Sequence, residues 1–414
     1  MGKTLILLLT VLLLTSASSC DKEDESTGEQ PEPKQIKLTA SGAEVVGSSN
    51  DFGIQLFTET ARQETGNLML SPLSASAALT MLLNGCEEET YEQIRDMLGY
   101  PADMGLEEIN ETYQGLVRQL LDADPKVKLA LANAVFYRDD FEVKTPFMEV
   151  MDDAFDANIE GLDFGHPSTV DVINQWAGDN TEGRIDQVID EIDPLMMMFL
   201  MNALYFKGEW TQQFDEADTR DRPFFPDEDN EIEVPTMIGE VGIWTYEGDG
   251  YRVAEMPYGR TNFSMVVIVP DNGLSTYYED FSPAVWQEIT ASLDQQPGTR
   301  EITVMMPKFE FEYEKVLNDQ LKGLGMTEAF EPRVADLSGI SDEEIFVSFV
   351  KQNTFVEVNE EGTEAAAVTT IGIEVTSIGP EPSEFIVDQP FIFAIRERTT
   401  NSLLFIGSVN NPVN

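Results

Sequence analysis

The stretch "VNEEGTEAAAVTTIGIEVTSIGP", Val358–Pro380, contains residues that suit two different backbone conformations. Its first half has acidic residues and a run of alanines, which favour a helix. Its second half is rich in Val, Thr and Ile, which favour a strand, and a Gly-Pro pair then ends it. The sequence around this stretch indicates what a protein does with such a segment.

The rest of the chain predicts an α+β fold, because no internal repeat is present and helical patterns precede large groups of strands. "SPLSASAALTMLLNG" begins with Ser71 and Pro72, which are typical of a helix N-terminus. "TYEQIRDMLG" has Thr90 and Gln93 at the spacing of a capping box. Apolar runs predict buried strands in "KLALANAVFYRD", "MMFLMNALYFKGEW", "FSMVVIVPD" and the C-terminal "EFIVDQPFIFAIRERTTNSLLFIGSVNNP".

The charge balance excludes one class of partner. Of the 414 residues, 25 are Lys or Arg and 76 are Asp or Glu, which gives a net charge of −51. A surface this acidic repels phosphate backbones, so we expect no nucleic-acid partner, and it disfavours heparin-like ligands. The acidic residues are spread along the whole chain. This favours a role in solubility, for instance in a salty habitat, over an acidic binding patch.

Few side chains are available for catalysis or metal binding. His166 is the only histidine, and Cys20 and Cys86 are the only cysteines, so a zinc site built from His and Cys lacks ligands. No GxSxG motif is present, and "DFGHPSTV" predicts a surface loop around His166; a hydrolase would need this histidine to be essential. The acidic "DEDNEIE", 227–233, lacks the glycine of an EF-hand loop. We therefore expect no metal, no cofactor and no enzymatic activity.

The amino end, "MGKTLILLLTVLLLTSASSC", is typical of an exported protein. Its apolar run from Leu5 to Leu14 is short for a membrane span and predicts a cleaved signal peptide. The small residues before Cys20 resemble a bacterial lipoprotein box, although Ala17 stands where leucine is commonest. The resemblance implies a signal peptide over 1–19, a lipid on Cys20, and a place in the outer membrane or on the cell surface. The alternative is a secreted or periplasmic protein with a free cysteine.

The segment after Cys20 predicts a tether over 20–48. "DKEDESTGEQPEPKQ", 21–35, is acidic, polar and proline-bearing, which is typical of disorder. Acidic residues directly after the lipidated cysteine also resemble the surface-export signal of some Gram-negative lipoproteins. The folded domain is then expected over 49–414. In that domain Cys86 has no partner once Cys20 is lipidated, so we expect it to be a buried free thiol.

Taken together, six stretches of the chain resemble the serpin family. They are "NLMLSPLSASAALTMLLNGCEEETYEQIRDMLG", "INQWAGDNTEGRI", "MNALYFKGEWTQQFDEADTRDRPFF", "PKFEFEYEKVLNDQLKGLGMTEAF", "VEVNEEGTEAAAVT" and "PFIFAIRERTTNSLLFIGSVNNP". They occur in the family's order and span roughly 49–414. The resemblance implies a metastable serpin fold with three β-sheets, about nine helices and an exposed reactive loop at about 360–384.

The resemblance also implies a function for the opening stretch. In the family a serine protease attacks the reactive loop as a substrate, and the cut loop then inserts into the main sheet as a new strand. The protease stays attached and its active site is distorted. This chain is therefore expected to be a suicide-substrate inhibitor that forms a covalent 1:1 complex as a monomer. The alternative is a non-inhibitory serpin that acts as a binding or carrier protein.

The loop sequence permits such an insertion. Alternate side chains of a strand lie on opposite faces of a sheet, and the face toward the core must be uncharged. One set of alternate residues carries no charge: Thr363, Ala365, Ala367, Thr369, Ile371, Ile373 and Val375. The other set holds both internal acids, Glu364 and Glu374. Gly362 supplies a backbone pivot, and the predicted hinge comprises Glu360, Gly362, Thr363, Glu364, Ala365, Ala366 and Ala367.

Family spacing places the reactive bond fourteen residues after Gly362, at Thr376–Ser377, flanked by Val375 and Ile378. The loop is a few residues longer than in well-known members, so the bond is assigned only within 374–378. No Arg or Lys lies between Gly362 and Pro390, which disfavours trypsin-like targets. The apolar flanks favour elastase-like or subtilisin-like proteases.

Further family positions lie where the sheet is expected to open. They are Ser71, Ser74, Asn202, Trp210 and Gln352. Capping and ordinary core packing are the alternative roles for these side chains. Many members carry a histidine where this chain has Gln352, ten residues before Gly362. The amide still donates and accepts hydrogen bonds, but a histidine's pH dependence is not expected.

Overall fold

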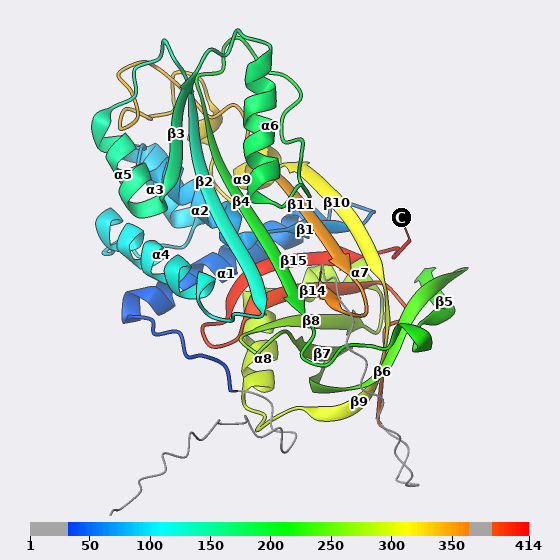
Figure 1. The fold of residues 1–414 in the computed structure, drawn as a ribbon. Coiled ribbons are helices and arrows are strands. Elements are labelled where there is room, and N and C mark those ends of the chain that lie inside the picture. Colours follow the sequence, from blue (N-terminus) through cyan, green and yellow to red (C-terminus); the bar gives the residue numbers. More distant parts are fainter. Residues whose placement is uncertain (1–31, 228, 364–382, 414) are drawn as a thin grey trace, which may run out of the picture. The chain divides into compact units, whose positions relative to one another are not determined.

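The computed structural model describes residues 32–227, 229–363 and 383–413. Contacts group Glu32–Asn414 into one compact unit, and within the described ranges this unit contains nine α-helices and fifteen strands (Figure 1). The expected α+β class is confirmed. His166 lies in an exposed loop and Cys86 is a buried free thiol, as expected.

The helices surround the sheets and are short apart from the first. Their bounds are α1 Ala40–Ala61, α2 Pro72–Leu83, α3 Glu88–Met97, α4 Leu106–Leu121, α5 Thr145–Phe155, α6 Ser168–Asn180, α7 Leu274–Asp280, α8 Pro283–Asp294 and α9 Asn318–Gly323, with 3₁₀ turns η1 Glu216–Asp218 and η2 Glu328–Phe330. Ser71 caps α2 as expected, since its side chain accepts a hydrogen bond from the Ser74 amide.

The capping box predicted at Thr90 and Gln93 is wrong, because α3 begins earlier, at Glu88. Both side chains bind a different part of the chain. Thr90 accepts a hydrogen bond from the Asp336 amide at 3.0 Å, and Gln93 accepts one from the Thr327 amide at 3.0 Å. The two polar side chains therefore fasten the 327–336 segment to α3.

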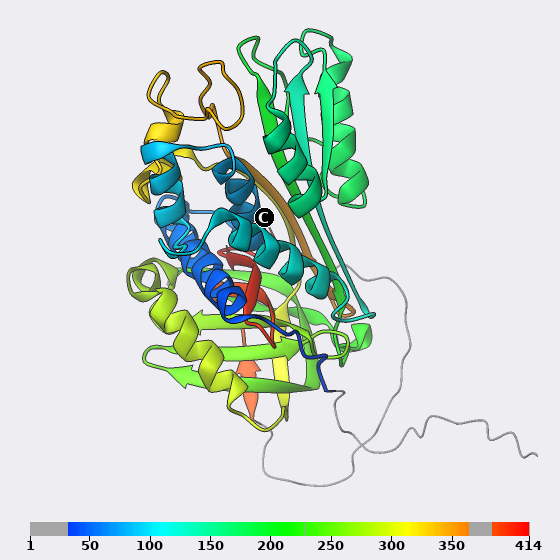
Figure 2. The ribbon, with the colours of Figure 1, turned by 90° about the vertical axis from the view of Figure 1, so that its left-hand side faces the viewer.

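A six-stranded sheet runs through the middle of the domain. Its order is β10 (Phe309–Val316), β11 (Lys351–Val358), β12 (Gly362–Thr363), β4 (Met198–Glu209), β2 (Val127–Arg138) and β3 (Ala157–Leu162). Helix α2 packs on one face of β4 and α6 on the other, as the two views show (Figures 1 and 2). The predicted strands "KLALANAVFYRD" and "MMFLMNALYFKGEW" form β2 and β4.

The other nine strands form two sheets that share β6. The strands are β1 (Leu68–Leu70), β15 (Ser402–Val409), β14 (Phe391–Glu397), β8 (Phe263–Pro270), β7 (Tyr251–Pro257), β6 (Asn230–Gly248), β9 (Arg300–Pro307), β13 (Glu384–Ile386) and β5 (Arg220–Asp227). Strand β6 pairs with β7 through residues 244–248 and with β9 through 236–243. With the six-stranded sheet this gives the three sheets that were expected. Every residue of β8, β14 and β15 is buried, so these strands form the centre of the core.

The folded domain begins earlier than the predicted boundary at residue 49. Helix α1 starts at Ala40, and its Val45 and Val46 are buried. The extended segment before it is also part of the domain, because Ile36 is buried and the Lys34 amide donates to Asn262 Oδ1 at 2.8 Å. The predicted tether over 20–48 is therefore wrong for residues 32–48, where Ile36, Val45 and Val46 anchor the chain to the domain.

Candidate functional site

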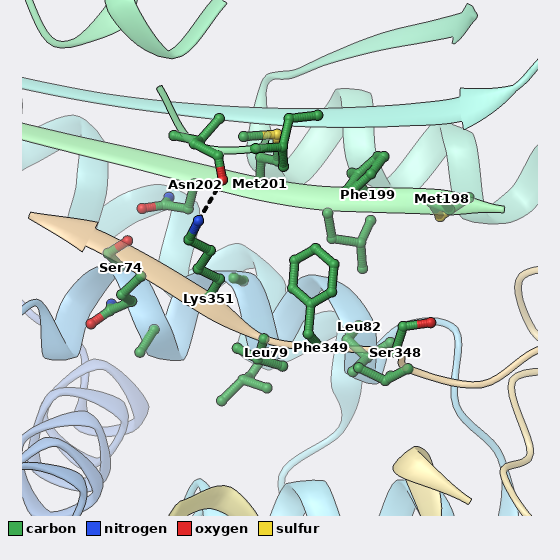
Figure 3. A pocket seen from close by; sticks show the side chains of 18 of the residues that line it. Ser74, Leu79, Leu82, Met198, Phe199, Met201, Asn202, Ser348, Phe349 and Lys351 are labelled. Atoms are coloured by element: carbon green, nitrogen blue, oxygen red, sulfur yellow. Dashed lines mark hydrogen bonds between the residues drawn. The ribbon is translucent and has the colours of Figure 1, made fainter. Parts of the chain in front are cut away.

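One strand position of the six-stranded sheet is filled only at one end. Thr363 of β12 pairs with Val358 of β11 on one side and with Gly208 of β4 on the other. Within the described ranges no residue continues β12 between these neighbours. A cavity of about 230 Å³ lies there instead, lined mainly by β4, β11, the 345–350 segment and α2 (Figure 3).

The backbone before β12 makes a tight turn. The Asn359 amide donates to the Gly362 carbonyl at 3.0 Å, and Gly362 has a φ of 155°. A Cβ atom on Gly362 would lie 2.1 Å from the Gly208 carbonyl oxygen. Only glycine therefore allows the chain to approach β4 this closely.

Glu360 is buried beside this turn and its carboxylate is fully partnered. Lys308 Nζ lies 2.8 Å from one carboxylate oxygen, and Thr219 donates to the other at 2.7 Å. Burial acts to raise the pKa of Glu360, but the hydrogen bonds from Lys308 and Thr219 outweigh it and hold this pKa below its ordinary value. The hinge is thus held by a charged side chain that stays ionised.

Trp210 contacts the same turn from the end of β4. Its indole stacks on Tyr258, with ring centroids 4.4 Å apart and planes 10° apart. Its Nε1 donates to the Asn359 carbonyl at 2.9 Å, and its backbone amide donates to the Glu361 carbonyl at 2.8 Å. Trp210 therefore packs in the core and also hydrogen-bonds to the hinge, so both roles considered for it are present together.

The side chain of Thr363 points into the core. It is 3% exposed, and its hydroxyl lies 2.6 Å from that of the fully buried Tyr258. Thr363 belongs to the uncharged set of alternate loop residues. It is also the only member of that set that the described residues include.

Gln352 joins β11 to the start of α2. Its Nε2 donates to the Ser71 carbonyl at 2.8 Å, and its Oε1 accepts from the Ser71 amide at 3.2 Å. The Ser71 hydroxyl in turn donates to the Leu404 carbonyl at 2.8 Å. The amide of Gln352 thus donates and accepts at once, and Ser71 and Ser74 line the cavity beside it.

Asn202 of β4 lines the same cavity as Gln352 of β11, and Figure 3 shows Asn202 on β4. Its Nδ2 donates to Asn133 Oδ1 at 2.7 Å, and Asn133 donates to the Phe155 carbonyl at 2.6 Å. The Oδ1 atom of Asn202 is buried without a hydrogen-bond partner among the described residues. A buried amide oxygen of this kind is costly unless another group reaches it.

The predicted site residues divide into two groups. The structure brings Glu360, Gly362, Thr363 and Trp210 together at the hinge, and Ser71, Ser74, Gln352 and Asn202 around the cavity below it. Outside the described residues lie Cys20, Glu364, Ala365, Ala366, Ala367, Val375, Thr376, Ser377 and Ile378. The sequence reasoning missed Lys308, Thr219 and Tyr258, because nothing near them in the sequence marks a contact with the hinge.

Within the described ranges, no group of three or more His, Cys, Asp or Glu side chains is arranged to hold a metal ion. Nor is any described helix long and apolar enough to cross a membrane. The Nδ1 atom of His166 lies 2.7 Å from the hydroxyl of Ser168, the first residue of α6.

Comparisons with known proteins agree with this architecture. The family described as "Serpin (serine protease inhibitor)" matches residues 47–412. Iripin-5 of Ixodes ricinus is 34% identical over 380 residues, which cover 88% of this chain and 94% of that protein. The native structure of the thermophilic serpin tengpin superposes with a TM-score of 0.80 at 30% identity, covering 91% of this chain and 96% of tengpin. Human thyroxine-binding globulin, complexed with its hormone, gives a TM-score of 0.80 at 25% identity, covering 90% and 100% of the two chains.

Proposed function

The chain belongs to the serpin family, and from that membership we propose that it is a suicide-substrate inhibitor of serine proteases. In this proposal the protease serine attacks the carbonyl of the reactive bond, the peptide bond breaks, and the new amino terminus leaves. An ester then joins the protease to the loop. Insertion of the loop into the six-stranded sheet must outpace hydrolysis of that ester.

The observation that carries the proposal is the half-filled strand position at β12. Continuing its antiparallel register past Thr363 assigns two neighbours to each alternate loop residue. Ala365 would lie between Val356 and Phe206, Ala367 between Thr354 and Leu204, Thr369 between Gln352 and Asn202, Ile371 between Val350 and Leu200, and Ile373 between Ser348 and Met198.

This register directs the uncharged set of loop residues toward the core. Val356, Thr354 and Gln352 of β11 are buried, and residues paired side by side across strands share a face of the sheet. Glu364 and Glu374 would then point to the opposite face. A slip of one residue would bury both glutamates, so the register is strongly selected.

The register also supplies a partner for Asn202. Thr369 would enter between the Gln352 and Asn202 side chains, where the buried Asn202 Oδ1 lacks a hydrogen bond. The hydroxyl of Thr369 is a donor of the right kind. The inserted loop would therefore satisfy a polar atom that the present structure leaves unsatisfied.

The loop sequence specifies the class of target. We propose the bond Thr376–Ser377, or one within 374–378, with elastase-like or subtilisin-like proteases as targets, because the flanking Val375 and Ile378 are apolar and β-branched.

The first test mixes the purified protein with elastase or subtilisin and follows denaturing gels and mass spectrometry. A band at the summed mass, with a released peptide that starts near Ser377, is expected. Cleavage of the loop without any such band, across a range of salt concentrations, would contradict the proposal.

A matched pair of variants tests the insertion itself. Thr369→Arg places a charge on the face directed to the core, and Thr370→Arg places the same charge on the opposite face. Burying an unpaired charge is prohibitive, so we expect the first variant to be cleaved as a substrate and the second to trap the protease. Equal trapping by both variants would exclude the proposed register.

The alternative function is that of a non-inhibitory carrier, which is supported by the structural similarity to thyroxine-binding globulin. Thermal unfolding after loop cleavage separates the two functions. An inserted strand adds hydrogen bonds on both of its edges, and we expect the unfolding temperature to rise by roughly 10 °C or more, at about 2 °C for each kcal/mol. An unchanged unfolding temperature would favour the carrier.

We further propose that the inhibitor is a monomeric bacterial lipoprotein, anchored to the outer membrane or cell surface through a lipid on Cys20. The lipoprotein-like box at the amino end supports this. Labelling with a radioactive fatty acid should mark the protein, and Cys20→Ala should abolish the label and release the protein into the soluble fraction. An unlabelled soluble parent would indicate secretion or a periplasmic location instead.

A further inference from the structure

Most of the partly exposed methionines among the described residues lie at one cavity. Ten of the sixteen methionines within the described ranges are buried. The six that are partly exposed are Met148, Met196, Met197, Met198, Met201 and Met305. Four of these six line the cavity between β4 and β11, because they belong to the run "MMMFLM" at the start of β4.

These four thioethers cover both faces of the open strand position. Met198 packs against the large core cluster that includes Leu79 of α2, and Met201 packs in the aromatic cluster that includes Phe199 beneath α6. Figure 3 shows Met198, Phe199 and Met201 along β4, with Phe349 opposite them. A small solute that enters the cavity therefore meets sulfur atoms on either side of the sheet.

Insertion of the reactive loop would close this cavity. In the register derived above, Ile373 would pair with Met198 and Ile371 with Leu200, so the end of the groove beside Met198 would be covered by apolar side chains. The thioethers suit both states, since methionine is unbranched, polarisable and adaptable. A polar oxygen on the same sulfur atoms would not suit the second state.

We propose that Met196, Met197, Met198 and Met201 form an oxidation site that regulates loop insertion, an inference that rests on the proposed function. Hydrogen peroxide or a hypohalous acid transfers one oxygen atom to a thioether sulfur. The sulfur is oxidised by two electrons to the sulfoxide, and the oxidant is reduced to water or halide. Methionine sulfoxide reductases reverse the change.

The sulfoxide would act on the branch point between trapping and release of the protease. Its oxygen must leave water when Ile373 arrives. The groove donors Gln352, Asn202 and Lys351 are already hydrogen-bonded to other groups, so burial of the sulfoxide oxygen costs free energy and insertion slows. Hydrolysis of the acyl-enzyme takes place on the protease and is unaffected. We expect insertion to slow by about tenfold, which corresponds to about 1.4 kcal/mol in the barrier, so that more inhibitor is cleaved for each protease trapped.

The single cysteine of the described chain does not compete as the redox-sensitive group. Cys86 is 5% exposed, and its thiol donates to the Leu82 carbonyl at 3.2 Å. Burial, followed by the charges of Asp336 and Glu87, raises the pKa of the thiol far above its ordinary value. Since the thiolate is the reactive form, this cysteine is protected from oxidation.

The experiment compares the parent protein with two leucine variants of matched type before and after peroxide. One variant replaces Met196, Met197, Met198 and Met201 with Leu, and the control replaces Met148 and Met305 with Leu. Leucine conserves volume and cannot be oxidised. If the first variant folds poorly, Met198→Leu with Met201→Leu takes its place. The readouts are peptide mass spectra for added oxygen and the number of inhibitor molecules consumed per subtilisin trapped.

We expect the number of inhibitor molecules cleaved without trapping, per protease trapped, to rise about tenfold in the oxidised parent and the oxidised control variant, and sulfoxide reductases to restore it. The variant without groove methionines should keep its efficiency after peroxide. Equal losses in both variants would place the sensitive group elsewhere and overturn the proposal. So would groove methionines that are oxidised without any loss, or that resist peroxide in the folded protein.

A second readout separates this inference from the proposed function. Cleaving the loop with a metalloprotease and recording thermal unfolding reports insertion without any trapped serine protease. Unoxidised protein that traps no protease, but whose unfolding temperature rises after cleavage, would contradict inhibition alone. In that case oxidation should still delay the rise in unfolding temperature. A rise that oxidation leaves unchanged contradicts the oxidation site alone, and no rise in unoxidised protein contradicts both proposals.

Discussion

At the hinge, single side chains fix the backbone from which the reactive loop departs. Glu360 forms an ion pair with Lys308 and accepts a hydrogen bond from Thr219. Trp210 donates a hydrogen bond to the Asn359 carbonyl and stacks on Tyr258. Their partners belong to other strands or turns of the domain. A change at Glu360 is therefore expected to alter the hinge, whereas a change at Trp210 or Tyr258 is expected to alter the hinge and the core together.

Glu360→Gln keeps the shape of the side chain but removes its charge opposite Lys308. We expect the free energy of unfolding to fall by about 1.5 kcal/mol near neutral pH. Because hydrogen bonds from Lys308 and Thr219 outweigh burial and lower the pKa of folded Glu360, this stabilisation is present above the ordinary pKa of 4.5. It is lost as pH falls through the folded-state pKa. Urea unfolding of both proteins from neutral to acid pH measures the difference in their free energies of unfolding. A difference that stays the same at every pH would contradict this prediction.

Gln352→His should introduce a pH dependence that the amide avoids. A ring nitrogen of a neutral imidazole can accept from the Ser71 amide, as the Gln352 oxygen does. Protonation removes the acceptor, so the folded-state pKa of this histidine should lie below about 6.5. Its stabilisation is present above that pH and is lost as pH falls.

Thermal unfolding of the histidine variant at several pH values checks this prediction. Gln352→Met, which makes neither hydrogen bond, serves as the control and should be less stable by about 2 kcal/mol at every pH. A histidine variant whose unfolding temperature follows that of the wild type at all pH values would show that the Ser71 contact does not form.

At the scale of elements, the strand position between β4 and β11 and the segment before α1 matter most. The first is half-filled by β12, and the second attaches residues 34–39 to the rest of the domain. Lys34 bonds to Asn262, next to the turn that carries Tyr258, and Ile36 is buried.

Truncation tests where the domain begins. A chain that starts at Glu32 should unfold at the same temperature as the longer protein. A chain that starts at Ser49 loses the buried Ile36, Val45 and Val46. At about 1.5 to 3 kcal/mol for each apolar side chain, the loss approaches the whole stability of a domain. We expect little folded protein from the shorter chain by circular dichroism. Equal stability of the two chains would return the boundary to residue 49.

At the scale of the whole molecule, a chain with a net charge of −51 contains a set of alternate loop residues, from Thr363 to Val375, that carries no charge. Among the described residues that line the groove only Glu344 and Lys351 are charged, so we assign the net charge to encounter with other molecules and not to insertion. Long-range fields change how fast partners meet more than how tightly they hold.

The rate of trapping should therefore depend on the charge of the protease and on salt. We expect a basic serine protease to be trapped faster at low ionic strength, and the rate to fall as salt shortens the Debye length to about 8 Å. An acidic protease with the same specificity should show the opposite trend. Stopped assays of complex formation measure both rates, and identical salt profiles would exclude steering by the overall charge.

The sequence by itself determined the features that neighbours in the chain control. The alternation from Thr363 onward, the glycine at 362 and the strands β2, β4 and β8 all follow from local pattern and composition. Thr363 is buried as that alternation requires. The predictions of a capping box at Thr90 and of a domain boundary at residue 49 were wrong, because these parts of the chain contact segments that are distant in the sequence.

Only the tertiary structure decided which groups meet. Gln352 and Ser71 are 281 residues apart in the sequence, and Trp210 and Asn359 are 149 apart. Strand register and packing bring these partners together, and no local propensity encodes them. The same holds for the half-filled strand position and for the four methionines that line it. The half-filled strand position depends on the distance between β4 and β11, and these two strands come from separate stretches of the sequence.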